Sequence, residues 1–142
     1  MTELDMAAFE ARMLDQGFGK VLGARMTSLA PGHVTLRLPF RPELGRGDEL
    51  VHGGVIAALI DKAGTAAAWS YPDIGKGARG ATAAMNINFL EGAAHADLTA
   101  TAQVLRRGGA LTVADVDVTD DDNRLIAKGV VTYRLSKPKS AA

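Results

Sequence analysis

Residues 53–70 form the longest weakly polar stretch of this chain, and they constrain its fold more than any other segment. Asp61 and Lys62 are the only charged residues in this stretch, so a helix here would be apolar on nearly every side. A helix of that kind must be enclosed by other parts of the structure. The stretch is about long enough to cross a membrane, but its Ala and Gly content and its central charges favour a buried helix in a soluble domain.

The helix is entered through the corner His52-Gly53-Gly54, which can act on a carbonyl group. The first N–H groups of a helix lack partners, and the helix dipole favours negative charge at that end. A glycine there lets a ligand approach the backbone closely. The simpler interpretation is that Gly53 and Gly54 only make a tight corner.

Asp61 lies seven residues after Gly54 in otherwise apolar surroundings. Carboxylates are rarely buried unless they are paired or take part in chemistry. Lys62 is poorly placed to neutralise Asp61, because the side chains of adjacent helical residues point about 100° apart. We therefore expect a site that polarises a carbonyl at the helix entry and attacks it with the help of Asp61. The alternative is a purely structural acid.

The spacing of Gly54 and Asp61 also bears on assembly. The two residues lie on nearly the same face of the predicted helix, but about 10 Å apart along its axis. A carbonyl carbon and its oxygen are little more than an ångström apart, so one straight helix can hardly present both groups to them. Two such helices, packed antiparallel about a two-fold axis, would place Asp61 of one subunit beside Gly54 of the other. We expect a homodimer with shared active sites.

The composition narrows the class of protein. The chain has 142 residues, 47% of them hydrophobic, with 16 basic and 16 acidic residues. That is enough for one domain over residues 1–142 with its own core, and the balanced charge argues against nucleic-acid binding. There are no cysteines, and the acidic amino terminus lacks the pattern of a signal peptide. We therefore expect a cytoplasmic protein with no membrane partner.

The remaining sequence predicts one further helix and about six strands. Apolar residues recur at helical spacing over about 5–16, ahead of a glycine pair. Strands are expected over residues 21–29, 33–40, 81–90, 97–107, 111–119 and 125–135, with a loop over 41–51 and a frayed tail over about 137–142. The first of these strands has the weakest pattern. Consecutive strands joined by short turns pair antiparallel, so we expect an α+β domain in which the strands surround one buried helix.

With this order of elements, the chain resembles the hotdog-fold acyl-CoA thioesterases, in particular the branch related to the phenylacetate-pathway thioesterases. The resemblance is carried by His52-Gly53-Gly54 with the later Asp61, and it continues through residues 80–90 and 103–108. It covers roughly residues 20–135. It implies a curved antiparallel sheet around a central helix, an acyl-CoA substrate, no cofactor, and a homodimer that often pairs again into a homotetramer.

The resemblance also implies roles for individual residues. Gly54, or its neighbour Gly53, would donate a backbone N–H to the thioester oxygen, and Asp61 would be the nucleophile or general base. A hydroxyl one turn beyond the acid, or on the following strand, would orient the attacking water. Thr65 and Thr82 occupy these two positions, and the sequence does not choose between them.

Further positions are candidates for substrate binding. Members of the family tend to carry Asn or Gln six residues before the histidine, where this chain has Arg46. Asn86 lies in the strand that resembles the family's next strand, and Arg106 and Arg107 are candidates for contacts with coenzyme A phosphates. His52 is either a base or, as we favour, a residue that shapes the helix entry. The three histidines have no metal-ligand spacing, so we expect no metal.

Two other functions fit a domain of this kind. A non-catalytic acyl-CoA-binding module would share the fold without turnover, although a regulator of that type would need a DNA-binding segment for which the chain has no room. A dehydratase or hydratase of the same fold would need a His-plus-acid signature that the sequence lacks. The sequence does not determine whether the acyl group of the substrate is aromatic or a medium-length aliphatic chain.

Overall fold

The computed structural model describes residues 4–136, so the predicted tail at 137–142 lies outside the described residues. The elements follow in the order α1 (Met6–Leu14), α2 (Phe18–Leu22), β1 (Arg25–Ala30), β2 (His33–Leu38), a 3₁₀ turn (Pro42–Leu44), α3 (Gly53–Trp69), β3 (Arg79–Phe89), β4 (Leu98–Arg107), β5 (Leu111–Thr119) and β6 (Leu125–Ser136). The predicted helices and strands agree with these bounds within a few residues, except around α2.

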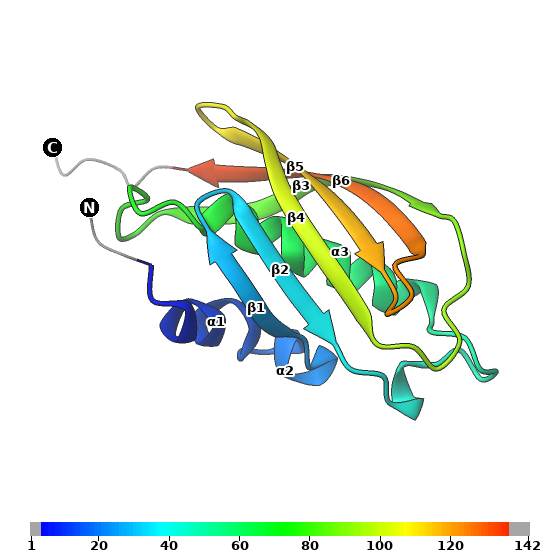
Figure 1. The fold of residues 1–142 in the computed structure, drawn as a ribbon. Coiled ribbons are helices and arrows are strands. Elements are labelled where there is room, and N and C mark those ends of the chain that lie inside the picture. The colour runs from blue at the N-terminus through cyan, green and yellow to red at the C-terminus, as the bar shows by residue number, and fades with distance from the viewer. Residues whose placement is uncertain (1–3, 137–142) are drawn as a thin grey trace, which may run out of the picture.

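All six strands belong to one antiparallel sheet with the order β1-β2-β4-β5-β6-β3. Helix α3 lies along one face of this sheet, and α1 and α2 lie beside its β1 edge (Figure 1). The predicted α+β class, with six strands around a central helix in a hotdog-like arrangement, is confirmed.

Strand β3 departs from the predicted pairing. The sequence pattern predicts that residues 81–90 pair with 97–107 across a short turn, but β3 pairs with β6 and forms one edge of the sheet. The connection between β3 and β4 is too long for a tight turn, and it docks on the loop before α3. There the Val51 N–H donates to the Ala93 oxygen at 2.9 Å, and the His95 N–H donates to the Glu49 oxygen at 2.9 Å. Through this docked connection, the chain passes from the edge strand β3 to β4, which lies between β2 and β5 in the sheet.

The strand predicted over residues 21–29 was wrong at its start. Gly17 and Gly23 have φ angles of 52° and 80°, in the left-handed region that glycine adopts readily. The residues between them form α2, with Gly23 as its C-cap, and β1 begins only at Arg25. The glycines in this segment therefore mark two turns rather than the flanks of one long strand.

Two glycines allow α3 to pack closely against β6. A Cβ atom at Gly64 would lie 2.7 Å from the Val131 Cβ, and one at Gly129 would lie 2.7 Å from the Ile60 Cγ2. Non-bonded carbon atoms do not approach so closely, so both contacts need glycine. The surrounding core consists of fully buried apolar side chains: Leu36, Leu38, Leu59, Ile60, Leu98, Val116, Val118, Ile126 and Val131. This packing fixes α3 beside the strand that neighbours β3.

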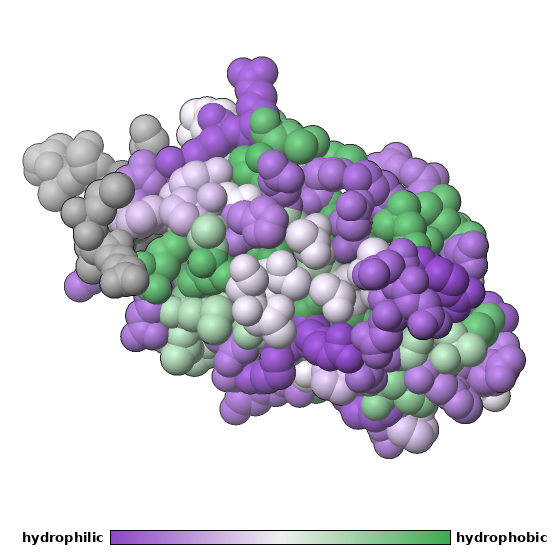
Figure 2. Space-filling model, viewed as in Figure 1, coloured by the Kyte–Doolittle hydropathy of each residue, from purple (hydrophilic) through white to green (hydrophobic). Residues whose placement is uncertain are grey.

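The face of the sheet turned away from α3 is largely hydrophilic (Figure 2). On this face, Lys128 Nζ lies 2.6 Å from Asp115 Oδ2 and 2.7 Å from Asp117 Oδ1. These hydrogen bonds raise the pKa of Lys128 above its ordinary value. Within the described residues, no helix is long and apolar enough to cross a membrane.

Candidate active site

Asp61 on α3 and Thr82 on β3 are joined by a hydrogen bond. Thr82 Oγ1 donates to Asp61 Oδ1 at 2.6 Å. Asp61 is half-buried and Thr82 is exposed, so the pair lies at the open border between the central helix and the edge strand. Within residues 4–136 the second carboxylate oxygen of Asp61 makes no hydrogen bond. That oxygen is available to accept a hydrogen bond from water.

Lys62 does not neutralise this carboxylate. The Lys62 Nζ donates instead to the backbone oxygen of Met13 at 3.4 Å. This direction is expected, because adjacent side chains on a helix do not face the same way. Among the described residues, the neighbour that contacts the Asp61 carboxylate is therefore a hydroxyl and not a cation.

Thr65 lies one turn beyond Asp61, but it lines a cavity to which Asp61 does not contribute. It lines a cavity of about 400 Å³ together with Trp69 and Tyr133. In the described part of the chain, Thr65 makes no hydrogen bond to Asp61. The structure brings Thr82 to the carboxylate and places Thr65 on the wall of a cavity that Asp61 does not line.

Tyr133 on β6 belongs to the same region, although the sequence patterns did not single it out. It is the cross-strand partner of Thr82, and its hydroxyl accepts a hydrogen bond from Trp69 Nε1 at 2.8 Å. Burial raises the pKa of the Tyr133 phenol, and the negative charge of Asp61 adds to this rise. A Cβ atom at Gly80 would collide with the Tyr133 ring. A glycine two residues before Thr82 was thus the available signal for a large side chain on the neighbouring strand.

The entry of α3 is capped by His52. Its Nδ1 accepts the backbone N–H of Gly54 at 2.8 Å, and its backbone oxygen accepts the N–H groups of Val55 and Ile56 at 3.0 and 3.2 Å. A side-chain acceptor at this position satisfies one of the free N–H groups of the first turn. The Gly54 N–H is thereby occupied, whereas the Gly53 N–H makes no hydrogen bond within the described residues.

Arg46 lies near this entry, where it is engaged by Asp48. Its Nε is 3.1 Å from Asp48 Oδ1, and its Nη2 is 3.0 Å from Asp48 Oδ2. The side-chain hydrogen bond from Arg46 lowers the pKa of Asp48. Arg46 and Gly53 both line a cavity of about 370 Å³. The Arg46 guanidinium can bind a ligand in this cavity either while it stays bonded to Asp48 or after that ion pair has broken.

Asn86 is not brought to the Asp61 site. It pairs with Val130 on β6, and its neighbour Ile87 pairs with Gly129. A Cβ atom at Gly129 would contact both Ile60 of α3 and Ile87, so these positions face the helix. Because side chains alternate along a strand, Asn86 faces away from α3.

Arg106 and Arg107 lie at the end of β4, away from the helix entry. Arg107 Nη2 is 2.6 Å from Asp73 Oδ1, and its guanidinium carbon lies 3.9 Å from the centre of the Tyr71 ring. Arg106 is exposed and forms no ion pair within residues 4–136. Of the two arginines, Arg106 is therefore the one whose guanidinium is available to a phosphate group, since that of Arg107 is paired with Asp73.

The described residues contain no group of three or more His, Asp or Glu side chains arranged to hold a metal ion. His33 begins β2, and the ring of His95 lies 5.1 Å from that of Phe40. These two histidines take part in local structure, and within residues 4–136 neither of them hydrogen-bonds to His52.

Comparisons with known proteins were made by sequence and by structure. A family model described as "Thioesterase superfamily" matches residues 49–127, a range that contains the capped helix entry, Asp61 and Thr82. Acyl-coenzyme A thioesterase 13 from Homo sapiens is 31% identical over 137 residues, which cover 95% of this chain and 94% of that protein.

Solved structures with the same arrangement include thioesterase superfamily member 2 from zebrafish. The two structures superpose with a TM-score of 0.83 at 32% identity, over 94% of this chain and all 100% of the other. The PaaI protein from the phenylacetic acid degradation operon of E. coli gives a TM-score of 0.80 at 23% identity, over 94% of this chain and 98% of that one. At that identity the second likeness shows the fold alone.

Proposed function

The chain belongs to the thioesterase superfamily and has its hotdog fold, and on this premise we propose that it is an acyl-CoA thioesterase that hydrolyses a thioester to a free acid and coenzyme A. The observation that carries the proposal is the 2.6 Å hydrogen bond from Thr82 to Asp61. It orients a carboxylate beside which no cation lies among the described residues, and it leaves one carboxylate oxygen open. The similarity to an acyl-coenzyme A thioesterase supports coenzyme A as the thiol of the substrate.

Asp61 acts in this proposal as the general base or the nucleophile. As a base, its open oxygen takes a proton from water while the water oxygen bonds to the thioester carbon. The tetrahedral intermediate then collapses, the C–S bond breaks, and the sulfur leaves with a proton. As a nucleophile, the carboxylate bonds to the carbon and expels the thiolate, and water hydrolyses the resulting anhydride. In both routes Thr82 holds the carboxylate in one orientation.

The entry of α3 supplies the electrophilic part of the site. The thioester oxygen gains negative charge as the intermediate forms, and N–H groups at a helix N-terminus stabilise that charge. Gly53 is the donor with an available N–H, because the Gly54 N–H is bound to His52. Gly54 takes the role instead if the imidazole turns aside or shares this N–H when substrate binds.

The active site is shared between the subunits of a homodimer. The distance of about 10 Å between Gly54 and Asp61 along one α3 helix supports this, and so does the exposed edge of β3. Nearly all residues of this 11-residue edge strand are exposed, and an unpaired edge offers backbone groups to another strand. Pairing two β3 edges about a two-fold axis would set Asp61 of one subunit against the α3 entry of the other.

The same contact would cover apolar side chains. Met85 and Phe89 on β3 are 41% and 54% exposed in the single chain, and burying them would favour association. It would also enclose the Thr82–Asp61 pair, which a single chain leaves open at the border of the sheet. A second pairing of dimers into a homotetramer follows from the family resemblance.

The test is thiol release from a panel of acyl-CoA esters, both aromatic and aliphatic, followed with a thiol reagent. Turnover by the wild type that is lost in Asp61→Asn supports the proposal. Binding of acyl-CoA without thiol release would identify the protein as a non-catalytic acyl-CoA-binding hotdog protein instead. In the same assay, Arg106→Gln tests the coenzyme A contact, because it should raise KM more than it lowers kcat.

A further inference from the structure

A cavity begins one turn of α3 beyond Asp61, at Thr65, and its lining includes two positively charged side chains. Its volume is about 400 Å³, and it is lined by Arg12, Met13, Thr65, Trp69, Gly75, Lys76, Gly77, Ala78 and Tyr133. Thr65 and Trp69 follow Asp61 at intervals of four residues, so they continue the same face of the helix. Trp69 lies about 12 Å from Asp61 along the axis. Thr65 therefore marks the end of the cavity that is nearer to Asp61, and Trp69 marks the end that is farther from it.

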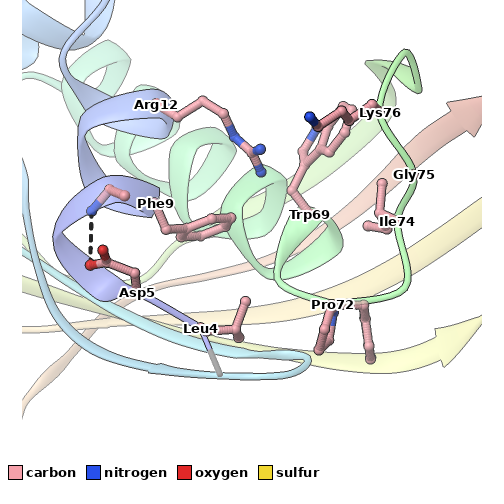
Figure 3. A pocket seen from close by; sticks show the side chains of 11 residues that line it. Leu4, Asp5, Phe9, Arg12, Trp69, Pro72, Ile74, Gly75 and Lys76 are labelled. Atoms are coloured by element: carbon pink, nitrogen blue, oxygen red, sulfur yellow. Dashed lines mark hydrogen bonds between the residues drawn. The ribbon is translucent and has the colours of Figure 1, made fainter. Parts of the chain in front are cut away.

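A second cavity of about 410 Å³ adjoins the remote end, between α1 and the segment 71–76 (Figure 3). The two cavities share Arg12, Trp69 and Lys76. In Figure 3 the side chains of Arg12 and Lys76 both extend toward the Trp69 ring. The guanidinium carbon of Arg12 lies 5.4 Å from the centre of the Phe9 ring and 5.8 Å from that of Trp69. These aromatic contacts hold the guanidinium at the boundary of the two cavities.

Arg12 and Lys76 have no carboxylate partner among the described residues, whose ion pairs all join other side chains. Asp5 lines the second cavity, but its carboxylate accepts the backbone N–H of Ala8 at 3.2 Å. Two like charges that line the same cavities without an ion-pair partner repel each other. An anionic group placed between them would relieve this repulsion and gain charge-assisted hydrogen bonds.

We propose that the enzyme favours acyl groups that end in a carboxylate, that is, monothioesters of dicarboxylic acids. The inference rests on the proposed thioesterase function. The thioester carbon lies at Asp61, the chain follows the wall formed by Thr65 and Trp69, and the terminal carboxylate lies between Arg12 and Lys76. A spacing of about 12 Å along the helix suits a chain of medium length. A coenzyme A phosphate shares this anionic chemistry, so the experiment separates the two sources.

The experiment compares octanoyl and octanedioyl thioesters, which have the same number of carbons and differ by the terminal carboxylate. Each is prepared as a coenzyme A ester and as an N-acetylcysteamine ester, which has no phosphate. We expect the wild type to have the higher kcat/KM for the octanedioyl ester in both series. The double variant Arg12→Gln/Lys76→Gln should lower the octanedioyl-to-octanoyl ratio of kcat/KM by about 10-fold to 100-fold in both series.

Controls keep the result specific to this charge pair. Lys20→Gln makes the same charge change at an exposed position of α2 that lines neither cavity, and it should leave the ratio unchanged. Lys76→Gln alone should move the ratio in the same direction as the double variant. Because Lys76 lies on an exposed loop, this single variant keeps the test valid if the Arg12 substitution disturbs α1.

The outcomes separate this inference from the proposed function. An unchanged ratio in the variants, or a wild type that disfavours octanedioyl esters, would overturn the inference even while octanoyl-CoA is hydrolysed in an Asp61-dependent way. A loss of kcat/KM in the variants that is confined to the coenzyme A esters would assign the two cations to a phosphate of coenzyme A. This result would also overturn the inference. If no thioester of either series is hydrolysed, the proposed function fails and the inference fails with it.

Discussion

Thr82 Oγ1 donates a 2.6 Å hydrogen bond to Asp61 Oδ1 and so joins the edge strand β3 to the central helix α3. The bond uses the only hydrogen of the hydroxyl, so Thr82 can contact a water molecule only as an acceptor. It also fixes the carboxylate through one oxygen and leaves the other oxygen open. Mutation of the two candidate threonines can therefore separate orientation of the carboxylate from lining of the neighbouring cavity.

Thr82→Ala should lower kcat by about 10-fold to 100-fold, because the carboxylate loses the hydrogen bond that orients it. Thr82→Ser keeps the hydroxyl and should restore most of the turnover. Thr65→Ala, on the cavity wall, should change KM more than kcat. The measurement is steady-state kinetics on the best acyl-CoA ester, with circular dichroism to verify folding. A sharp loss of kcat in Thr65→Ala, with Thr82→Ala intact, would assign the orienting hydroxyl to Thr65.

Asp61→Asn should retain the fold and lose about 10²-fold to 10⁴-fold in turnover, the usual effect of removing a general base. The amide has nearly the same shape as the carboxylate and can still accept the Thr82 hydrogen bond, so stability should change little. The assay is thiol release, with thermal unfolding as the control for structure. Turnover close to that of the wild type would place the chemistry on another residue.

His52→Ala should lower the free energy of unfolding by about 1 kcal/mol, because the Gly54 N–H loses its capping acceptor. Asn is a favourable N-cap residue, so His52→Asn should recover this stability. Chemical denaturation of the three proteins measures the effect. If His52→Asn is as stable as the wild type but has lost turnover, the imidazole takes part in the reaction and does more than shape the helix entry.

Tyr133→Phe should change the stability of the protein at high pH. Burial raises the pKa of Tyr133 above its ordinary value of 10.0, so the folded chain holds the phenol proton more tightly than the unfolded chain does. The stability that this provides is fully present below about pH 10 and is lost as the pH rises further. The difference in unfolding free energy between wild type and Tyr133→Phe should therefore shrink above pH 10. A difference that stays constant up to pH 11 would contradict this.

The secondary structure was accessible from the sequence where its signal is local. The apolar stretch 53–70 and the alternation in residues 33–40 depend on neighbours a few positions apart. The position of β3 at the edge of the sheet was not accessible in this way. It depends on pairing with β6, whose residues follow their partners in β3 by 38 positions at Phe89–Ala127 and by 57 positions at Arg79–Ser136. It also depends on the docking of the β3–β4 connection beside Val51.

The residues of the candidate site differ in the same way, since some depend on local sequence signals and others on long-range pairing. Asp61 and the His52-Gly53-Gly54 corner are visible in the linear sequence, since a lone acid in an apolar helix and a glycine pair at its start are local patterns. The contact of Thr82 with Asp61 is not, because it depends on the register of β3 against β6 and on the irregularity that follows Thr82. Tyr133 and the Arg12–Lys76 pair reach this region from distant segments, so only the folded chain brings them to it.

The shared active site can be tested by mixing two inactive subunits. Gly53→Pro and Gly54→Pro each remove one N–H from the first turn of α3, where proline is tolerated. Whichever of them abolishes turnover is co-expressed with Asp61→Ala under a second affinity tag. If Asp61 of one subunit works with the helix entry of the other, each heterodimer holds one intact pair, and part of the wild-type activity should return. Purified heterodimers without activity would mean that each site lies within a single chain, and a protein that sediments as a monomer would remove the shared site altogether.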